Sequence, residues 1–254
     1  MAGLKDKVVI ITGAARGIGQ EYSLRFAQEG CKVVAADVLD VTDTVKKVEA
    51  AGAQVLGLKV DVTSNAELAA MVEKTLARFT RIDVLVNNAA IYGGLRMTPF
   101  DMLAEEEWDR VMAVNVKAVW QACRAVVPVM LKQKHGKIIN ISSGTIWMGV
   151  PYLLHYVTSK GAVWAMTRSL ARELSGTGIN VNAVTPGFTM TEASMNITNR
   201  EQFEQTRDMI VSAQIIKRSE QATDLVGAVA FLASSDADFI TGQTINVDGG
   251  AIHH

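Results

Sequence analysis

A glycine-rich turn that directly follows a short apolar run is the feature that most constrains the fold of this chain. The run Lys7 to Ile11 is apolar and β-branched, which predicts a buried parallel strand. The turn Thr12-Gly13-Ala14-Ala15-Arg16-Gly17-Ile18-Gly19 follows it and leads into a helical stretch. Glycines allow close approach to the backbone, and a helix N-terminus offers unpaired N–H groups, so a phosphate group fits here. The G-x-x-x-G-x-G spacing differs from the G-x-G-x-x-G dinucleotide fingerprint, and a turn without a ligand is the alternative.

An acidic residue ends the second predicted strand. The run Lys32 to Ala36 is again apolar, and Asp37 follows it at once. An acidic residue at about this distance from the glycine turn can bind both ribose hydroxyls of an adenosine.

Tyr156 and Lys160 stand four residues apart, and Ser143 lies upstream of them. Positions i and i+4 share one face of a helix, so phenol and ammonium can point into one pocket. A nearby lysine cation lowers the pKa of a tyrosine from its usual value of about 10, which lets the phenol exchange a proton with a substrate. A surface tyrosine–lysine pair is the alternative for these two residues alone. His155 precedes the tyrosine, and we expect it at the rim of the pocket, because helical neighbours diverge by about 100°.

Strand and helix patterns alternate along the chain without an internal repeat or a linker. This predicts one α/β domain over residues 1–254, with a Rossmann-type doubly wound seven-stranded parallel sheet and helices on both faces. After the first two, strands are predicted at Val55–Val60, Ile82–Val86, Lys137–Ile141, Asn180–Val184 and Gln243–Val247. Helices are predicted at Asn65–Phe79, at Glu105–Gln133 with a kink or a new turn at Pro128, and at His155–Leu174.

Residues 188–216 break this alternation. They lie beyond the carboxyl end of the sixth predicted strand, where open α/β sheets bind ligands. They are also rich in polar residues such as Thr189, Asn196, Thr198 and Asn199. We expect a helical, mobile substrate lid, and an ordinary surface insertion is the alternative.

Composition argues against several classes of function. The net charge is −1, no basic cluster indicates a nucleic acid or membrane partner, and no apolar run approaches the roughly 20 residues of a membrane span. Cys31 and Cys123 lack metal-ligand spacing, so we expect reduced core residues and no metal site. The first residues lead straight into a strand, from which we expect no signal peptide and a cytoplasmic enzyme. His253 and His254 fit either a native terminus or the remnant of a purification tag.

Four motifs together resemble the short-chain dehydrogenase/reductase family, over nearly the whole chain from about Lys5 to Gly250. They stand in the order and spacing of that family: Thr12-Gly13-x-x-x-Gly17-x-Gly19, Asn87-Asn88-Ala89, Ser143 and Tyr156-x-x-x-Lys160. The family usually has glycine where this chain has Ala90, a departure of one methyl group.

The resemblance implies an NAD cofactor and assigns its contacts. The expected cofactor-binding residues are Gly13, Arg16, Gly17, Ile18, Gly19, Asp37, Asp61, Val62, Asn88, Ala89, Tyr156, Lys160, Pro186, Gly187, Thr189 and Thr191. We expect NAD(H) to be preferred over NADP(H), because a 2′-phosphate would meet the negative charge of Asp37. Arg16 can attract that phosphate, but the ribose hydroxyls lie directly at the end of the second strand.

The resemblance also implies catalytic roles. Tyr156 exchanges the hydroxyl proton of the substrate while a hydride moves between the same carbon and the nicotinamide. Ser143 donates a hydrogen bond to the substrate oxygen, and Lys160 lowers the tyrosine pKa and binds the nicotinamide ribose. Asn115 binds a water that relays protons to the lysine, and a buried structural asparagine is the alternative.

The expected substrate is a neutral, mostly apolar secondary alcohol with an aromatic or cyclic group, oxidised reversibly to its ketone. The residues expected around the reacting carbon offer no obvious cationic clamp and are Ser143, Thr145, Trp147, Leu153, Tyr156 and Phe188. Ile91-Tyr92, Trp147 and the segment 239–244 resemble relatives that act on aromatic-ring alcohols, such as 1-phenylethanol dehydrogenases.

A β-ketoacyl-carrier-protein reductase is the alternative within the family, although such enzymes normally use a phosphorylated cofactor. A non-catalytic dinucleotide-binding regulator and another Rossmann-type enzyme, such as a methyltransferase, are the alternatives from other classes. Neither needs the Tyr156 and Lys160 pair.

The helix after Tyr156 is rich in small residues and also carries Trp164 and Met166. Because the family pairs such helices between subunits, we expect a homotetramer.

Overall fold

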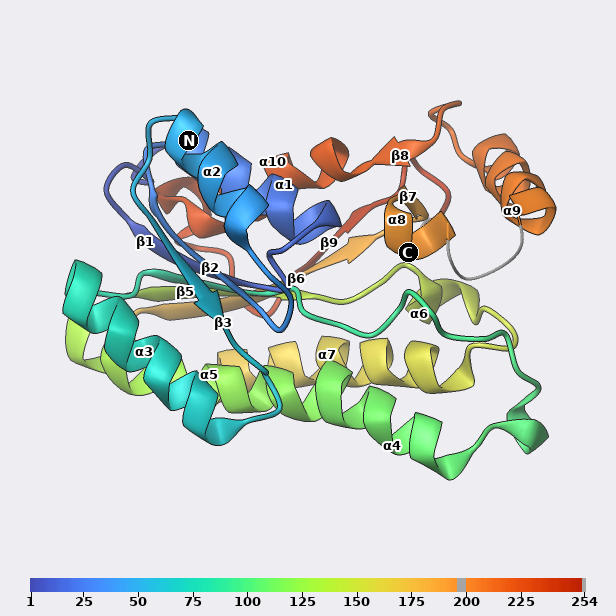
Figure 1. Cartoon of the computed structure of the whole chain (residues 1–254), viewed down its shortest axis with the longest axis horizontal. Coiled ribbons are helices and arrows are strands. Elements are labelled where there is room, and N and C mark those ends of the chain that lie inside the picture. The colour runs from blue at the N-terminus through green and yellow to red at the C-terminus, as the bar shows by residue number, and fades with distance from the viewer. Residues whose placement is uncertain (196–199, 253–254) are drawn as a thin grey trace.

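The computed structural model describes residues 1–195 and 200–252 and centres on a parallel β-sheet (Figure 1). Its seven strands lie in the order β3-β2-β1-β4-β5-β6-β9, and all neighbours pair in parallel. The predicted doubly wound seven-stranded sheet is therefore confirmed. The strands are β1 (Val8–Thr12), β2 (Lys32–Asp37), β3 (Val55–Lys59), β4 (Val84–Asn87), β5 (Gly136–Ile141), β6 (Ile179–Pro186) and β9 (Thr244–Val247).

The strand order reverses between β1 and β4. β1 pairs with β2 on one side and with β4 on the other, so the chain returns from the β3 edge to the middle of the sheet. The connections that leave β1 and β4 run in opposite directions, which opens a crevice at the carboxyl ends of these strands.

Helices cover both faces of the sheet (Figure 1). α1 (Gly17–Gln28), α2 (Thr42–Ala50) and α10 (Ala222–Ala233) lie on one face, and α3 (Asn65–Phe79), α4 (Glu105–Met112), α5 (Ala118–Gln133) and α7 (Leu154–Glu173) lie on the other. Successive strand residues point to opposite sides of a sheet. Val9 and Ile11 therefore belong to one hydrophobic cluster, and Val8 and Ile10 belong to the other.

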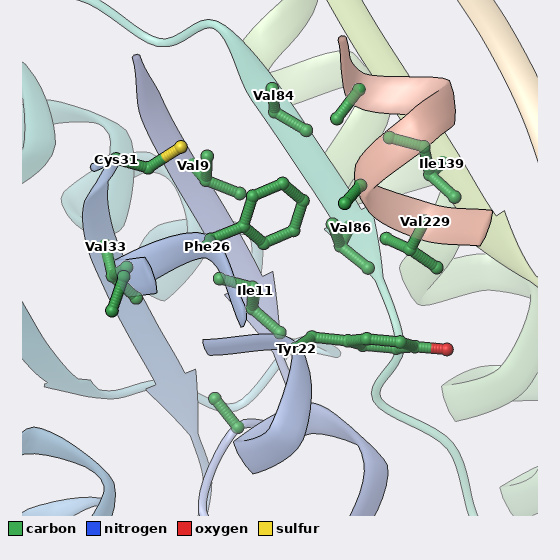
Figure 2. Packing of buried hydrophobic residues seen from close by; sticks show 14 of the residues in the cluster. Val9, Ile11, Tyr22, Phe26, Cys31, Val33, Val84, Val86, Ile139 and Val229 are labelled. Carbon is green, nitrogen blue, oxygen red and sulfur yellow. The ribbon is translucent and has the colours of Figure 1, made fainter. Parts of the chain in front are cut away.

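Two aromatic side chains of α1 fill the first cluster (Figure 2). Tyr22 and Phe26 lie beside Val9 and Ile11 of β1 and Val86 of β4. Both rings are no more than 1% exposed. Complete burial of a large apolar side chain contributes about 1.5–3 kcal/mol. These contacts hold the helix that follows the glycine turn against the sheet.

The predicted helix at Asn65–Phe79 is confirmed at both ends. The Ser64 side chain accepts a hydrogen bond from the Glu67 N–H, and Thr80 ends the helix in the left-handed conformation with φ of 66°. The strand bounds differ from their predictions by a residue or two. β6, for example, continues to Pro186, because its last residues pair with β9.

The predicted helical span Glu105–Gln133 is interrupted, but not at Pro128. α4 ends before a π-helical turn at Ala113–Lys117, and α5 continues through Pro128. Pro128 is exposed, so water can reach the carbonyl group that the missing N–H leaves without a helical partner. The interruption instead surrounds Asn115, whose side chain bonds the backbone of Ile91.

The segment 188–216 is largely helical, as predicted, but it also contains a strand pairing that the sequence analysis missed. β7 (Thr189–Met190), α8 (Glu192–Met195) and α9 (Arg200–Ala213) precede β8 (Glu220–Gln221), and β7 pairs in parallel with β8. α9 stands apart from the two helix layers (Figure 1). Four residues of the predicted lid, Asn196, Ile197, Thr198 and Asn199, lie outside the described residues, as do His253 and His254.

Short helices complete the described part of the chain: η1 (Phe100–Met102), α6 (Thr145–Met148) and η3 (Ser235–Ala237). Among the described residues, no helix is both long enough and apolar enough to span a membrane.

Candidate active site

A cavity of about 1080 Å³ occupies the crevice at the carboxyl edge of the sheet. Its lining contains every predicted cofactor-binding residue, namely Gly13, Arg16, Gly17, Ile18, Gly19, Asp37, Asp61, Val62, Asn88, Ala89, Tyr156, Lys160, Pro186, Gly187, Thr189 and Thr191. It also contains most of the predicted substrate residues, namely Ser143, Thr145, Leu153, Tyr156 and Phe188. Asn115 and Trp147 lie outside this lining.

The glycine turn after β1 is folded so tightly that it excludes side chains. Gly13 has φ of +67°, and a Cβ there would lie 2.8 Å from Ala89 Cα. A Cβ on Gly19 would overlap the carbonyl oxygen of Gly13. The turn therefore presents bare backbone and the first N–H groups of α1 to the cavity, an arrangement that fits a phosphate group.

Two polar side chains join this turn to the end of β4. The Thr12 hydroxyl accepts hydrogen bonds from the backbone N–H groups of Asn88 and Ala89, both at 3.1 Å. The Asn88 side chain donates to the carbonyl oxygens of Thr12 and Gly13, both at 3.0 Å. These bonds fix the relative position of the two strand ends that line the cavity.

Asp37 is held in place at the end of β2. One carboxylate oxygen accepts a hydrogen bond from the Ala15 N–H and the other from the Leu39 N–H, both at 2.9 Å. Each oxygen keeps a lone pair for a further donor, so ribose hydroxyls can bind there. Arg16 forms an ion pair with Glu192 of α8 at 3.0 Å, but both side chains are more than half exposed, so this pair is weak.

Ser143, Tyr156 and Lys160 come together where β5 meets α7. They are 6%, 7% and 4% exposed, respectively. Lys160 Nζ lies 5.7 Å from the centre of the Tyr156 ring and donates a hydrogen bond to the carbonyl oxygen of Ile141 at 2.9 Å. The Ser142 hydroxyl donates to the Lys160 carbonyl oxygen at 2.8 Å. These bonds hold the lysine at the end of β5, beside the tyrosine.

Burial, rather than the lysine charge, governs the pKa of Tyr156 in this structure. Burial raises that pKa well above its usual value, Tyr92 adds to the rise, and a hydrogen bond with Ser143 opposes it. Burial also lowers the pKa of Lys160, to about 8. The expectation that Lys160 brings the tyrosine pKa towards neutrality is therefore wrong for this structure, because both groups have lost water. A protonated phenol beside a lysine that is still charged at neutral pH is arranged to donate a proton.

Asn115 lies behind the cavity wall and is 1% exposed. Its side-chain oxygen accepts a hydrogen bond from the Ile91 N–H at 2.7 Å, and its amide nitrogen donates to the Ile91 carbonyl oxygen and to the Ser159 hydroxyl, both at 3.1 Å. Ser159 in turn donates to the carbonyl oxygen of Tyr156 at 2.7 Å. Asn115 therefore braces α7 against the loop after β4, and the water relay through this residue stays a prediction.

The structure corrects the expected positions of two residues. Trp147 packs edge-to-face against Trp164 of α7, with ring centroids 5.7 Å apart, instead of lining the substrate pocket. His155 is fully buried rather than at the pocket rim, and its Nε2 lies 3.0 Å from Glu107 Oε1 of α4. Because helical neighbours diverge by about 100°, Tyr156 reaches the cavity while His155 faces α4.

The cavity wall contains residues that were not among the predicted site residues. Tyr92, which the resemblance to aromatic-alcohol dehydrogenases already pointed to, lines the cavity and contacts Tyr156, with ring centroids 4.8 Å apart. Its place shortly after the Asn87-Asn88-Ala89 motif is a signal that could have assigned it to the site. Phe203 of α9 contacts Phe188, with ring centroids 5.6 Å apart. Phe203 lies within the predicted lid 188–216, which is a general signal, but only the tertiary placement of α9 shows that this particular side chain reaches the cavity.

The residues present fit a dinucleotide. At one end of the cavity the glycine turn offers bare backbone and Asp37 offers carboxylate acceptors, and Tyr156 and Lys160 lie elsewhere in the same lining. Among the described residues, no group of three or more His, Cys, Asp or Glu side chains is arranged to hold a metal ion.

Comparisons with known proteins agree with this geometry. A family model described as enoyl-(acyl carrier protein) reductase matches residues 13–252. The 3-oxoacyl-[acyl-carrier-protein] reductase of Thermotoga maritima is 38% identical over 251 residues, which cover 98% of this chain and 99% of that protein. A solved structure of a 7α-hydroxysteroid dehydrogenase complexed with NADH and 7-oxo glycochenodeoxycholic acid is 30% identical, with a TM-score of 0.91 over 99% of this chain and 96% of that one. The 3-ketoacyl-(acyl-carrier-protein) reductase from Brucella melitensis complexed with NADH is 32% identical, with a TM-score of 0.86 over 98% and 99%.

The buried tyrosine generates the first testable prediction. We expect Tyr156→Phe to lower kcat for NAD-linked hydride transfer by at least about 10²-fold, because it removes the only oxygen of this side chain that could exchange a proton. The dissociation constant for NADH, measured by fluorescence, should change little. Tyr22→Phe is the matched control, since the buried Tyr22 hydroxyl has no hydrogen-bond partner among the described residues. A folded Tyr156→Phe variant that keeps more than a few per cent of the wild-type kcat would show that another group moves the proton.

Proposed function

Because the chain belongs to the short-chain dehydrogenase/reductase family, we propose that it transfers a hydride reversibly between NAD(H) and a neutral, mostly apolar secondary alcohol or its ketone. The alcohol would carry an aromatic or cyclic group. The observation that carries this proposal is the buried group of Ser143, Tyr156 and Lys160, which shares one cavity with the glycine turn. That group favours an enzyme over a non-catalytic dinucleotide-binding regulator or a methyltransferase, because neither has a use for it.

Residues along the cavity fit NAD(H). The glycine turn would hold the pyrophosphate, Asp37 would accept the adenosine ribose hydroxyls, and Lys160 and the segment from Pro186 to Thr191 would hold the nicotinamide end. When bound, the nicotinamide accepts or supplies the hydride. Two similar proteins of known structure carry NADH, which supports this choice of cofactor.

Three side chains of this chain handle the proton. Ser143 donates a hydrogen bond to the substrate oxygen and holds it at the tyrosine hydroxyl. Tyr156 gives its proton to the ketone oxygen in reduction and becomes a phenolate, and in the reverse reaction this phenolate takes the alcohol proton. Lys160, whose pKa of about 8 keeps it charged at neutral pH, stabilises the phenolate that reduction leaves behind.

The apolar part of the cavity lining supports an apolar substrate. Aromatic and aliphatic side chains from several elements line the cavity, among them Tyr92, Leu153, Phe188, Phe203 and Ile210, and Tyr92 and Leu153 pack with Tyr156. An aromatic or cyclic group that leaves water for such a wall gains about 25 cal/mol for each Å² of apolar surface buried.

The cations in the cavity lining argue against an anionic group beside the reacting carbon. Lys160 belongs to the catalytic group, and Arg16 is an exposed residue of the glycine turn, which is expected to contact the cofactor. Arg110 of α4 also lines the cavity, but it is exposed to solvent. A carboxylate or phosphate held among the apolar side chains would lose its hydration without a buried cation to replace it.

A β-ketoacyl-carrier-protein reductase is the second candidate. The name of the relative that is 38% identical over 98% of this chain favours it. Asp37 would repel the 2′-phosphate of the phosphorylated cofactor that such reductases normally use. The net charge of −1 also gives no excess of positive charge to attract an acidic carrier protein.

Two further predictions about the assembled enzyme belong to the proposal. α9, which places Phe203 and Ile210 in the cavity lining, would act as a mobile substrate lid. A homotetramer in the cytoplasm would use α7, where Ala165 and Ser169 are exposed and a Cβ at Gly161 would have no described atom within 4 Å apart from its chain neighbours and the nearby backbone of its own helix. Light scattering that finds a monomer at micromolar concentration would contradict the tetramer.

A substrate panel tests the proposed function. Secondary alcohols such as 1-phenylethanol and cyclohexanol would be compared, with NAD⁺, against 3-hydroxyacyl thioesters, sugars and steroids. We expect the best aryl or cyclic alcohol to exceed every charged or polyhydroxylated substrate at least about tenfold in kcat/KM, which corresponds to about 1.4 kcal/mol. The Tyr156→Phe variant run in parallel excludes contaminating activity. A preference for thioesters would establish the second candidate, and a preference for sugars would contradict both.

Asp37 generates a prediction about the cofactor. We expect kcat/KM to be at least about tenfold higher with NAD⁺ than with NADP⁺, because the 2′-phosphate would approach a carboxylate at contact distance. Asp37→Ala should narrow this ratio. Asp40→Ala removes an exposed carboxylate just beyond β2 that does not line the cavity, so it should leave the ratio unchanged. An equal or higher kcat/KM with NADP⁺ in the wild type would contradict this prediction and show that attraction of the 2′-phosphate to Arg16 outweighs its repulsion by Asp37.

A further inference from the structure

A buried carboxyl group, that of Glu220, lies directly behind one wall of the cavity. Glu220 belongs to β8, pairs with Thr189 of β7, and is 5% exposed. One of its oxygens accepts a hydrogen bond from the Thr189 hydroxyl at 2.6 Å, and the other accepts one from the Gly187 N–H at 3.2 Å. Gly187 and Thr189 line the cavity, whereas Glu220 does not. The carboxyl group therefore holds this wall from outside.

The wall has little room to move at this point. A Cβ at Gly187 would lie 2.7 Å from Glu220 Oε2 and 2.8 Å from Asp248 Cβ, so the backbone of Gly187 is packed between these two residues. Asp248 is itself fixed, because its carboxylate accepts hydrogen bonds from the N–H groups of Gly250 and Ile252, both at 2.9 Å. A change in the bonds of Glu220 would therefore shift the wall rather than be absorbed elsewhere.

The surroundings of Glu220 disfavour its negative charge. Burial raises its pKa to about 7, against the hydrogen bonds from Thr189 and Gly187, and the charges of Asp224 and Asp248 add to the rise. No ion pair to Glu220 forms among the described residues, since the nearby Arg218 binds the Asp224 carboxylate at 2.6 Å. On the α1 side, burial and the charge of Glu220 both raise the pKa of Tyr22, which stays neutral.

The two protonation states make different hydrogen bonds with the wall. A carboxylate only accepts, so it can hold the Thr189 hydroxyl and the Gly187 N–H at the same time. A carboxylic acid carries its proton on one of the two oxygens. On the oxygen that faces Gly187, the proton would point at the Gly187 N–H and that hydrogen bond would be lost. On the other oxygen, the acid would donate to the Thr189 hydroxyl, which could then no longer donate its own hydrogen to Glu220. Hydrogen bonds to a charged group are also the stronger ones. Loss of the Glu220 proton therefore strengthens the hydrogen bonds that hold Gly187 and Thr189 in position.

We propose that Glu220 is a positioning residue. Its protonation state determines how tightly the Gly187–Thr189 wall binds the nicotinamide end of the cofactor. The inference rests on the proposed function, because it takes this wall to contact the nicotinamide. Cofactor affinity should rise as the pH rises and Glu220 loses its proton. The deprotonation of Lys160 at about pH 8 would act in the opposite direction, since it removes a charged ligand of the ribose. A comparison with a Glu220 variant separates the two effects.

The test is the dissociation constant of NADH, measured by fluorescence from pH 5.5 to 8 without substrate. In the wild type we expect it to fall about fivefold across pH 7. Glu220→Gln cannot ionise and mimics the protonated acid, so its dissociation constant should stay near the wild-type value at low pH and vary less than about twofold. Glu73→Gln, which changes an exposed carboxylate on α3, is the matched control and should follow the wild type.

A second variant covers the case in which Glu220→Gln does not fold. Thr189→Val removes a hydrogen bond that lowers the pKa of Glu220, so the midpoint of the pH dependence should move to higher pH, while Thr189→Ser should keep the wild-type midpoint.

Two results would overturn this inference while NADH still binds: a wild-type NADH dissociation constant that does not change with pH, or a Glu220→Gln variant that shows the same pH dependence as the wild type. Absence of NADH binding at every pH would overturn the proposed function and this inference with it.

Discussion

The junction between β1 and β4 is the constraint on which the site depends. Strand order reverses there, and Thr12 and Asn88 bond the glycine turn to the end of β4. A buried backbone group left without a hydrogen-bond partner costs about 1–3 kcal/mol, so breaking these bonds would be unfavourable, and they keep the ends of β1 and β4 together at the base of the crevice. Gly13 makes the close approach possible, since a side chain there would meet the backbone of Ala89. Parallel strands bring their carboxyl ends to one edge, which places Asp37 and Ser143 at the same crevice.

Loss of water then sets the chemistry of the groups at this edge. Burial raises the pKa of Tyr156 and lowers that of Lys160, because it disfavours the charged form of each group, the phenolate of the tyrosine and the ammonium of the lysine. A ketone oxygen that takes the tyrosine proton leaves a phenolate, and the lysine ammonium is the cation placed to stabilise it. Under the proposed mechanism, these two protonation states correspond to the enzyme before it reduces a ketone. Burial acts in the same way on Glu220, behind a different wall of the cavity.

The sequence predicted those parts of the fold and site that depend on local patterns. The turn Gly13–Gly19, the strand that ends in Asp37 and the helix Asn65–Phe79 are coded by consecutive residues, and all are present. Features set by tertiary contacts were missed or misplaced. Trp147 was expected in the pocket but packs on Trp164, because residue type does not reveal which face of a short helix is turned inward. The bond between Thr189 and Glu220 joins β7 to β8, strands too short to leave a periodic pattern.

The measurement that tests the central claim most directly is the pH dependence of ketone reduction with NADH, under conditions where a deuterium isotope effect shows that hydride transfer limits kcat. The claim is that the Lys160 cation stabilises the phenolate left on Tyr156. The pKa of Lys160 is lowered to about 8, so the cation is present below that pH and is lost as the pH rises through it. The account predicts a kcat that is constant at neutral pH and falls above about pH 8. A kcat that stays constant or rises from pH 7 to 10, with the isotope effect unchanged, would contradict it.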